Sequence, residues 1–523
     1  MRKTQEILIA IDWTDISMSG GTSNSQQLSS AVLLSSTEGS RHQLDFYDYG
    51  DDYVTSATHS RISLWQCFVG CRHKMNQQIA RRRVEQGLRL YNKNKQKAAI
   101  LKWQGALKQI RKKNDRFILL GYLYHAYIGF GKYRQSLEFA HNQLTIAEEM
   151  DSPNLRAEAY LNLAKAHERM GNLEKAFSYA RHSLYNECDH CRTAGLVQIT
   201  VGSLHLELAT FCKALQAFQQ AHTIAQRIQD RSLELQVYMC LSELFGRLQD
   251  TNKSAMYASK AYNLCRTLHV NELNSRYHRA ALLQMATALQ KQGELGDAHD
   301  YCSEATRLAL VSGDQPCYAR SIRIMGDIYR KKMEIGNAYR QYESAMTSAF
   351  SMGDRLCQME AMDGVAKCLE ILRNQQKICN CRPLEFNNKL LETANQVGAK
   401  LLMRAVRVRL CKICQSLGDV EQQAEHEKEI QRLEDELEMV CGSCNTPFGF
   451  EADSLEALPC THILHARCVY DILRKKDKKK NRTCPDCEKV VTSKLYLQGG
   501  DSPHQSNYNT FNSSTALEAS SIV

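Results

Sequence analysis

The apolar and polar positions of residues 75–417 repeat with a period of about 40 residues, and a mostly small residue marks the same place in each period. These marker positions are Gly87, Tyr124, Ala164, Gly202, Ser242, Ala286, Gly326 and Ala366. Twelve residues after each of the first seven stands a second small residue: Ala99, Ser136, Ala176, Ala214, Ser254, Ala298 and Ala338. Small side chains recur in this way where two helices cross closely, while larger residues such as Tyr160 and Phe218 fill the space between them.

Each period therefore predicts a pair of antiparallel helices joined by a turn such as GKY at residue 131 or GNL at residue 171. One pair cannot bury its own apolar face, so successive pairs must stack into a superhelix. The pattern resembles the tetratricopeptide repeat, although the usual period of that repeat is about 34 residues. We expect an all-α fold, a superhelical solenoid of seven to eight repeats over residues 75–417.

Residues 418–440 predict one more helix, with apolar residues at Val420, Ile430, Leu433, Leu437 and Val440. This stretch is short for a coiled coil of at least three heptads. An amphipathic helix that caps the solenoid and a helix that binds a partner are both compatible with it. Before this stretch, the segment RNQQKICNCRP (373–383) interrupts the eighth repeat, and residues 399–417 predict a further helix.

Eight cysteines and histidines follow over residues 441–490, with intervals of 2, 15, 1, 2, 2, 15 and 2 residues between them: Cys441, Cys444, Cys460, His462, His465, Cys468, Cys484 and Cys487. Zn²⁺ takes four nitrogen or sulfur ligands in a tetrahedron, so eight ligands predict two ions. The spacing resembles a RING-H2 finger. There the ligands interleave, which assigns Cys441, Cys444, His465 and Cys468 to one ion and Cys460, His462, Cys484 and Cys487 to the other.

Two such ions would be structural, because a tetrahedron of four protein ligands leaves no open position for water. They would also supply much of the folding free energy of so small a module, about 10 kcal/mol per site. RING fingers that act as ubiquitin ligases usually carry an aliphatic residue before the second ligand and a cation after the eighth. Here those positions are Ser443 and Glu488, although Pro485 after the seventh ligand is retained. Ligase activity therefore stays an alternative.

Composition narrows the class of protein further. The 523 residues are 43% hydrophobic with only seven prolines, which suits helical domains with real cores. No run approaches the ~18 apolar residues of a membrane span, and the N-terminus lacks the order of a secretory signal. We therefore expect the 21 cysteines to be thiols or metal ligands in a reducing compartment.

Four of them, Cys379, Cys381, Cys411 and Cys414, could form a further zinc site, with separate thiols packed between helices as the alternative.

The net charge of +10 includes two basic runs, residues 72–83 and 474–482, which suit acidic partners or simply a solvated surface. Neither interleaves aromatic residues as single-stranded nucleic-acid binders do, so we expect no nucleic-acid partner. Residues 75–440 contain no nucleotide-binding loop or nucleophile motif, and solenoids are recognition surfaces. We expect a binding protein, with RING-type ligase activity as the alternative.

Four sequence words support a closer resemblance: VEQGLRLY (84–91), ESAMTSA (343–349), GVAKC (364–368) and LEALPCTHILHARC (455–468). Together with the order of repeats, helix and RING-H2 finger, they make residues 77–487 similar to the rapsyn family. The resemblance implies a cytoplasmic scaffold, peripheral on the postsynaptic membrane of the neuromuscular junction, that clusters acetylcholine receptors. It implies self-association through the repeats, receptor binding by the helix before the RING, and a link from the RING to dystroglycan or other cytoskeletal partners. Ligase activity is also attributed to the family, which would imply a ubiquitin-conjugating enzyme as partner.

The two ends depart from that family or lie beyond the match. Family members begin Met-Gly and are N-myristoylated, whereas this sequence has Arg2. Residues 1–74 have no family counterpart, and we expect them to be mostly disordered, as we do residues 491–523. The pair Gly70-Cys71 suggests the hypothesis of an alternative start that would read Met-Gly-Cys and allow dual acylation. The terminal Ser521-Ile522-Val523 suits the groove of a PDZ domain.

Overall fold

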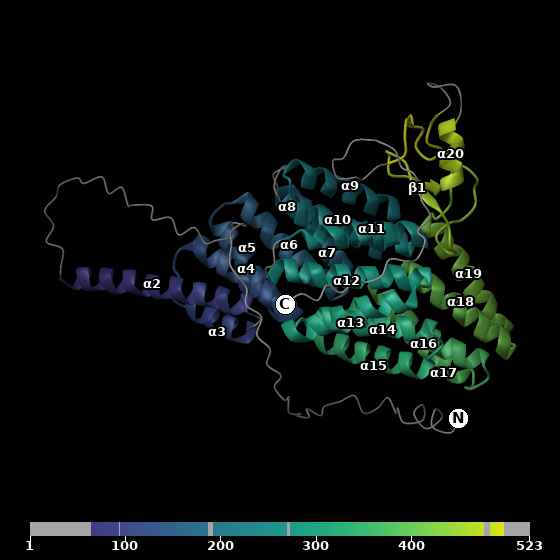
Figure 1. Cartoon of the computed structure of the whole chain (residues 1–523), viewed down its shortest axis with the longest axis horizontal. Coiled ribbons are helices and arrows are strands. Elements are labelled where there is room, and N and C mark those ends of the chain that lie inside the picture. Colours follow the sequence, from purple (N-terminus) through teal and green to yellow (C-terminus); the bar gives the residue numbers. More distant parts are fainter. Residues whose placement is uncertain (1–63, 94, 187–191, 269–271, 475–481, 496–523) are drawn as a thin grey trace, which may run out of the picture.

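The computed structural model describes residues 64–93, 95–186, 192–268, 272–474 and 482–495, with side chains described from residue 75 onward except at 272–274. Within this part, eighteen helices precede a small module of two strands and one helix (Figure 1). Helices α2 to α10 span Leu64–Asn92, Gln96–Leu107, Lys113–Gly129, Tyr133–Glu149, Pro153–Arg169, Leu173–Asn186, Arg192–Glu207, Phe211–Arg227 and Arg231–Arg247. Helices α11 to α19 span Thr251–Arg266, Glu272–Gln292, Leu295–Ser312, Gln315–Lys331, Ile335–Met352, Arg355–Asn374, Cys381–Val397, Lys400–Leu417 and Val420–Leu437.

Each even-numbered helix packs against the helix that follows it, which gives nine helical hairpins in the described residues. Each hairpin then packs against the next, so the predicted all-α solenoid is confirmed. The second series of small residues lies where the two helices of a hairpin meet, and each of its seven members is at most 1% exposed. The periodicity therefore marks close helix crossings, as the sequence predicts.

Three of the marker glycines accommodate an aromatic ring from the second helix of the same hairpin. An added Cβ would overlap the ring of Trp103 at Gly87, of Phe218 at Gly202 and of Tyr342 at Gly326. In each case the aromatic residue lies sixteen positions after the glycine, so the same contact recurs in three repeats. The missing side chain on one helix is thus matched by a large, fully buried side chain on its partner.

A glycine followed by an aspartate separates several hairpins. Gly313 and Gly353 adopt left-handed φ angles of 68° and 74°, which end α13 and α15 without the steric cost that a Cβ would impose. Asp314 and Asp354 then cap α14 and α16, each accepting a hydrogen bond from a backbone N–H of the first turn at 3.1 and 3.0 Å. These junctions set where one repeat stops and the next begins.

The superhelix winds far enough to bring distant repeats into contact. The Tyr133 hydroxyl of α5 donates to Asp354 at the start of α16, at 3.0 Å. Arg276 of α12 likewise donates to the Tyr91 hydroxyl of α2 and to the His125 carbonyl of α4. Because these contacts join residues more than 150 positions apart, they fix the curvature of the solenoid as well as its local packing.

Three boundaries differ from the sequence expectation. We expected disorder from residue 491 onward, but Val491 is buried and the Leu495 N–H donates to the Ala457 carbonyl at 2.7 Å. Helix α2 begins at Leu64, so residues 64–74 are helical where we expected disorder, because this stretch lacks proline and continues directly into the first repeat. Helix α19 pairs with α18 to form a ninth hairpin. Leu433 and Leu437 are buried in it, and Arg404 pairs with Glu434 at 2.6 Å. Residues 1–63 lie outside the described part of the chain.

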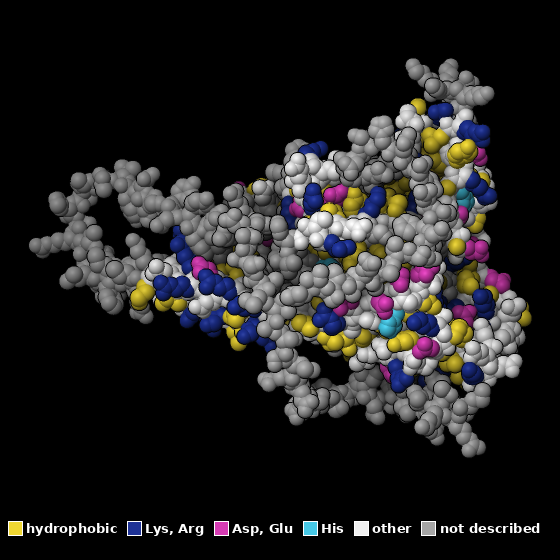
Figure 2. All heavy atoms as spheres, viewed as in Figure 1, with side chains coloured by type: hydrophobic (Ala, Val, Ile, Leu, Met, Phe, Trp, Pro, Cys, Tyr) yellow, Lys and Arg dark blue, Asp and Glu magenta, His cyan; other side chains and the backbone are white. Residues whose placement is uncertain are grey.

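Basic side chains gather along α2 and α3, as Figure 2 shows at the end of the molecule where the described chain begins. They include Arg82, Arg89 and Lys97, all of which are exposed. No described helix carries an eighteen-residue stretch with the low charge and high hydropathy that crossing a bilayer requires.

We predict that Gly364→Ala destabilises repeats α14–α16. A Cβ at position 364 would overlap the Tyr342 ring, which is fully buried, and overpacking of this kind costs about 1–3 kcal/mol. The matched control is Gly336→Ala in α15, where an added Cβ meets nothing and removal of glycine stabilises a helix by ~0.5–1 kcal/mol. Urea denaturation and hydrogen exchange of α14–α16 measure the difference, and equal stability of the two variants would contradict this packing.

Candidate metal centre

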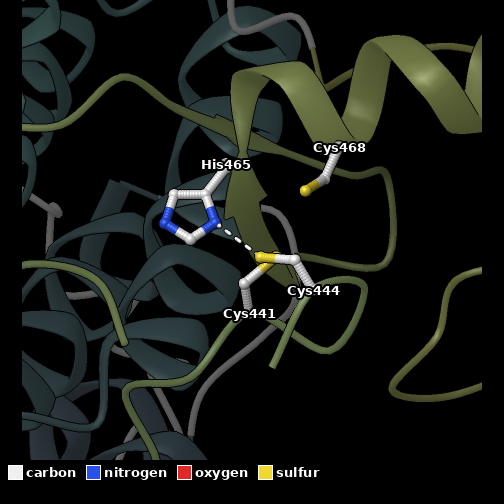
Figure 3. Close-up of side chains that lie close together, drawn as sticks. All are labelled: Cys441, Cys444, His465 and Cys468. Carbon is white, nitrogen blue, oxygen red and sulfur yellow. Dashed lines mark hydrogen bonds between the residues drawn. The ribbon is translucent and has the colours of Figure 1, made fainter. Parts of the chain in front are cut away.

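A turn, a strand end and a helix start position the first group of ligands. Cys441 and Cys444 lie on the turn after α19, while His465 ends β2 (Ile463–His465) and Cys468 lies in the first turn of α20 (Ala466–Arg474). Figure 3 shows these four side chains converging on a common space. Their ligand atoms all lie within 4.8 Å of one another. This is the compactness that one bound ion requires.

The second group is built from the turn between the two strands and from a turn near the end of the module. Cys460 and His462 lie between β1 (Leu455–Ala457) and β2, which pair antiparallel. Cys484 and Cys487 come from a turn closed by pairing of Thr483 with Val490. Their ligand atoms also lie within 4.8 Å of one another. The structure thus brings all eight predicted residues together in the two interleaved groups that the spacing suggests.

Both Cys-x-x-Cys turns have the same backbone conformation. The N–H of Asn445 donates to the Cys441 carbonyl at 2.8 Å, and the N–H of Glu488 donates to the Cys484 carbonyl at 2.8 Å. Asn445 and Glu488 take left-handed φ angles of 54° and 59°, which turn the chain just after the second cysteine of each pair. Each turn therefore presents two sulfur atoms on the same side, as a metal-binding loop must.

The ligand separations suit Zn²⁺. The Cys444 sulfur lies 3.3 Å from Nδ1 of His465, and the Cys460 sulfur lies 3.4 Å from Nδ1 of His462. A tetrahedral ion with Zn–S bonds of ~2.3 Å and Zn–N bonds of ~2.0–2.1 Å places sulfur and nitrogen about 3.6 Å apart. Both histidines thus offer Nδ1. Four donors would complete the coordination of each ion, which makes such sites structural and leaves no position for a substrate.

Asp453 is a residue that the sequence analysis does not identify. Its carboxylate lies 2.8 Å from Nε2 of His465, the ring nitrogen on the side away from the sulfur ligands. A carboxylate in this place accepts the Nε2 proton, so that Nδ1 is free to bind a metal ion, and it holds the ring in position. No spacing rule predicts such a residue, because it acts on a ligand and is not one.

Hydrogen bonding also favours the metal-binding form of the Cys444 sulfur. The Thr446 hydroxyl lies 2.9 Å from it, and the hydrogen bonds of Thr446 lower the pKa of the Cys444 thiol to about 6. The thiolate, which is the form that binds metal ions, is therefore favoured at neutral pH.

The metal-binding module packs against the solenoid and shares its core. Phe448 and Leu455 of the module belong to one buried cluster with Phe245 and Leu248 of the α10 region. Arg404 of α18 also lies over the Phe450 ring, 3.7 Å from its centroid. The module is therefore joined to the fourth and fifth hairpins by apolar burial, although it follows the ninth in sequence.

A polar contact between the start of α11 and strand β1 fixes the orientation of the module. Asp250 caps α11 through Oδ1, which accepts from the Lys253 N–H at 3.0 Å, while its Oδ2 accepts from the Leu455 N–H at 3.0 Å. The Lys253 ammonium donates to the Leu455 carbonyl and pairs with Glu456 at 3.0 Å. The start of α11 thus holds strand β1 through both the Asp250 carboxylate and the Lys253 ammonium.

The further cysteines do not form a third metal group in the part of the chain that the structure describes. Cys379 and Cys381 are exposed, whereas Cys414 is buried and the Cys411 thiol donates to Glu427 at 3.6 Å. Gly70 and Cys71 lie on α2 before residue 75, in the stretch whose side chains are not described. Residues 475–481, within the second basic run, and residues 521–523 fall outside the described residues, so the PDZ motif stays a prediction.

Fold and site together define a helical-repeat solenoid that carries a module with two Cys/His metal-binding clusters. Residues 75–154 match the family model described as the rapsyn N-terminal myristoylation and linker region. The chain is 30% identical over 425 residues to the 43 kDa receptor-associated protein of the synapse from Tetronarce californica, which covers 81% of this chain and 100% of that protein. The Gallus gallus protein of the same name is 30% identical over 429 residues, with the same coverage. The chain belongs to the rapsyn family.

A distant likeness to a solved structure also exists. The Rap protein complexed with competence and sporulation factor is 13% identical, with a TM-score of 0.43, and the match covers 68% of this chain and 98% of that one. The helical hairpins themselves, and not this likeness, define the fold.

We predict that Asp453→Asn weakens zinc binding at the first site by about 10–100-fold, because loss of a carboxylate partner has this effect on a histidine ligand. Competition with a chromogenic chelator measures the affinity, and metal analysis of the purified chain counts the ions, with two expected. Glu451→Gln is the matched control, since Glu451 is exposed and lies two residues away. The role given to Asp453 is wrong if both variants hold zinc equally well.

We predict that Lys253→Glu releases the module from the solenoid, because a carboxylate at position 253 would face both Asp250 and Glu456. Faster hydrogen exchange at the Leu455 amide and faster proteolysis of residues 441–474 report the release. The charge swap Lys253→Glu with Glu456→Lys should restore part of the protection, with an interaction energy of about 0.5–3 kcal/mol. Unchanged exchange in the single variant would show that apolar burial alone holds the module.

Proposed function

We propose that this protein is a postsynaptic scaffold that binds and clusters acetylcholine receptors and links them to the cytoskeleton. The observation that carries the proposal is membership of the rapsyn family over the full length of relatives named as receptor-associated proteins of the synapse. The fold supports it, because a solenoid offers recognition surfaces. The metal module supports it as well, because four protein ligands per structural Zn²⁺ leave no catalytic position.

In this proposal the solenoid self-associates, and the outer face of α19 binds a cytoplasmic loop of the receptor. The inner face of α19 packs on α18, so only the outer face is available. That face exposes Glu421, Glu425 and Asp435 with Lys428 and Arg432, which leaves it with one more acid than base. A basic receptor segment would complement it. The RING module would then contact dystroglycan or another cytoskeletal linker.

We further propose that the protein lies on the cytoplasmic face of the postsynaptic membrane as a peripheral protein. The exposed basic side chains along α2 and α3 support this placement (Figure 2), because each Lys or Arg near an anionic leaflet contributes ~1 kcal/mol of attraction. An acyl chain, if an alternative start supplies one, would add to this attraction.

A RING-type ubiquitin or ubiquitin-like ligase acting on the bound receptor is the second candidate. The observation that favours it is the exposure of Ser443 and Pro485, two positions at which RING ligases meet a conjugating enzyme. Both stay exposed although the module packs on the solenoid through Phe448 and Leu455. The polar Ser443 and the acidic Glu488 weigh against strong binding of that enzyme.

Co-expression with an acetylcholine receptor in a non-muscle cell tests the proposal, with microscopy of receptor patches at the surface. The native chain should form patches. Cys468→Ser with Cys484→Ser, which removes a ligand from each metal site, should abolish them without changing receptor expression. Pro485→Ala leaves all eight ligands in place and is expected to cluster receptors like the native chain. Loss of patches in Pro485→Ala, together with loss of receptor ubiquitination, would instead favour the ligase.

A further inference from the structure

A cleft of about 550 Å³ opens between α5, α6 and α7, away from the metal-binding module. Leu137 and Leu144 of α5 form its apolar part, while Tyr160 of α6 and Tyr179 of α7 contribute aromatic rings. All four side chains are partly exposed, so the cleft is accessible to solvent. Neither the metal sites nor the contacts between hairpins account for it.

Four rings stand in a row along this cleft. His182 lies 5.3 Å from Tyr160, Tyr160 lies 6.2 Å from Tyr179, and Tyr179 lies 5.4 Å from His167, all measured between ring centroids. The interplanar angles are 29°, 26° and 18°, so the rings are close to parallel. The result is an aromatic wall that is continuous across two helices and has an imidazole at each end.

The buried end of this wall has an unused hydrogen-bonding atom. His167 is 8% exposed, and its Nδ1 has no hydrogen-bond partner among the described residues. Burial, followed by the charges of Lys175 and His141, lowers the pKa of His167, so the ring is neutral at physiological pH. A ligand that brought a hydrogen-bonding oxygen to Nδ1 would satisfy this buried polar atom.

The charges around the cleft define the ligand further. His141, Lys175 and His182 are exposed at its edge. None of the described residues that line it is acidic. The complementary ligand therefore combines carboxylates with aromatic or apolar side chains, which is the chemistry of an acidic, aromatic peptide.

This chain contains such a peptide. Residues 45–53 read DFYDYGDDY, with four aspartates interspersed among four aromatic residues. We propose that the cleft between α5, α6 and α7 binds this acidic segment of a second copy of the chain. The contact would join two copies through their N-terminal extensions. It is separate from the solenoid self-association and from the receptor binding proposed above, and its tests do not depend on either.

The position of α2 favours a second copy over the same chain. Figure 1 shows the start of α2 projecting away from the rest of the solenoid. Its 29 residues place that start ~43 Å from the end that joins α3. The eleven steps from Tyr53 to Leu64 span at most about 40 Å. The acidic segment is thus tethered to the projecting end of α2, where a neighbouring copy can take it up.

Binding of a fluorescent peptide of residues 44–54 to the full chain tests the cleft. The receptor chain carries Asp45, Asp48, Asp51 and Asp52 all changed to Asn, so that its own segment does not compete. We expect saturable binding, weakened about tenfold by Lys175→Glu and weakened also by His182→Ala, both at exposed positions. Lys332→Glu, an equal charge change on the exposed end of α14, is the matched control. Equal binding to Lys175→Glu and Lys332→Glu, or no binding at all, overturns the proposal.

Light scattering of the full chain tests whether the acidic segment comes from a second copy. We expect the mass of the native chain to rise with concentration more steeply than that of the four-Asn variant or of Lys175→Glu. Restoration of the steep rise by mixing the four-Asn chain with the Lys175→Glu chain would support the contact, because each supplies the half that the other lacks. If the peptide binds but native and variant chains have the same mass at every concentration, the segment occupies the cleft of its own chain, and the second-copy proposal is wrong.

Discussion

The close approach of the two helices within each hairpin is the constraint on which the rest of this structure depends. At the crossing point only a hydrogen, a methyl or a hydroxymethyl group fits. Each residue of the second series of small residues is therefore at most 1% exposed. Larger side chains fit only where the partner helix has a glycine, as Phe218 does opposite Gly202. With the hairpins fixed in this way, their stacking, the superhelical curvature and the face that receives the metal module follow.

This constraint also explains why the repeat could be predicted from the sequence. A crossing that excludes side chains leaves its mark at fixed intervals, and the ligand order of a two-zinc module is equally regular because the chemistry of the ion imposes it. The start of α2 was not predictable, since residues 64–74 do not carry the repeat pattern. Nor was the pairing of α19 with α18, because an amphipathic helix has the same sequence pattern whether it caps a solenoid or binds a partner.

What sequence reasoning misses most are residues whose partners lie far away in the chain. Asp453 acts only because the fold brings it to His465, and Lys253 because β1 lies 202 positions later against the start of α11. The same holds for the cleft between α5, α6 and α7, where His167 is notable for the atom it leaves unpaired and not for any motif. These interactions depend on tertiary placement, which periodicity and spacing do not encode.

Asp250 shows how closely the metal module and the solenoid are joined. One carboxylate oxygen caps α11 and the other binds the edge of β1, so the same side chain completes two structures that appear separate in the sequence. A graft of residues 441–490 onto a foreign helical scaffold would leave behind the apolar surface of α9–α11 on which the finger packs and the acid that orients it. The unit that can be transplanted is therefore discontinuous, and it must include α9–α11 together with the finger.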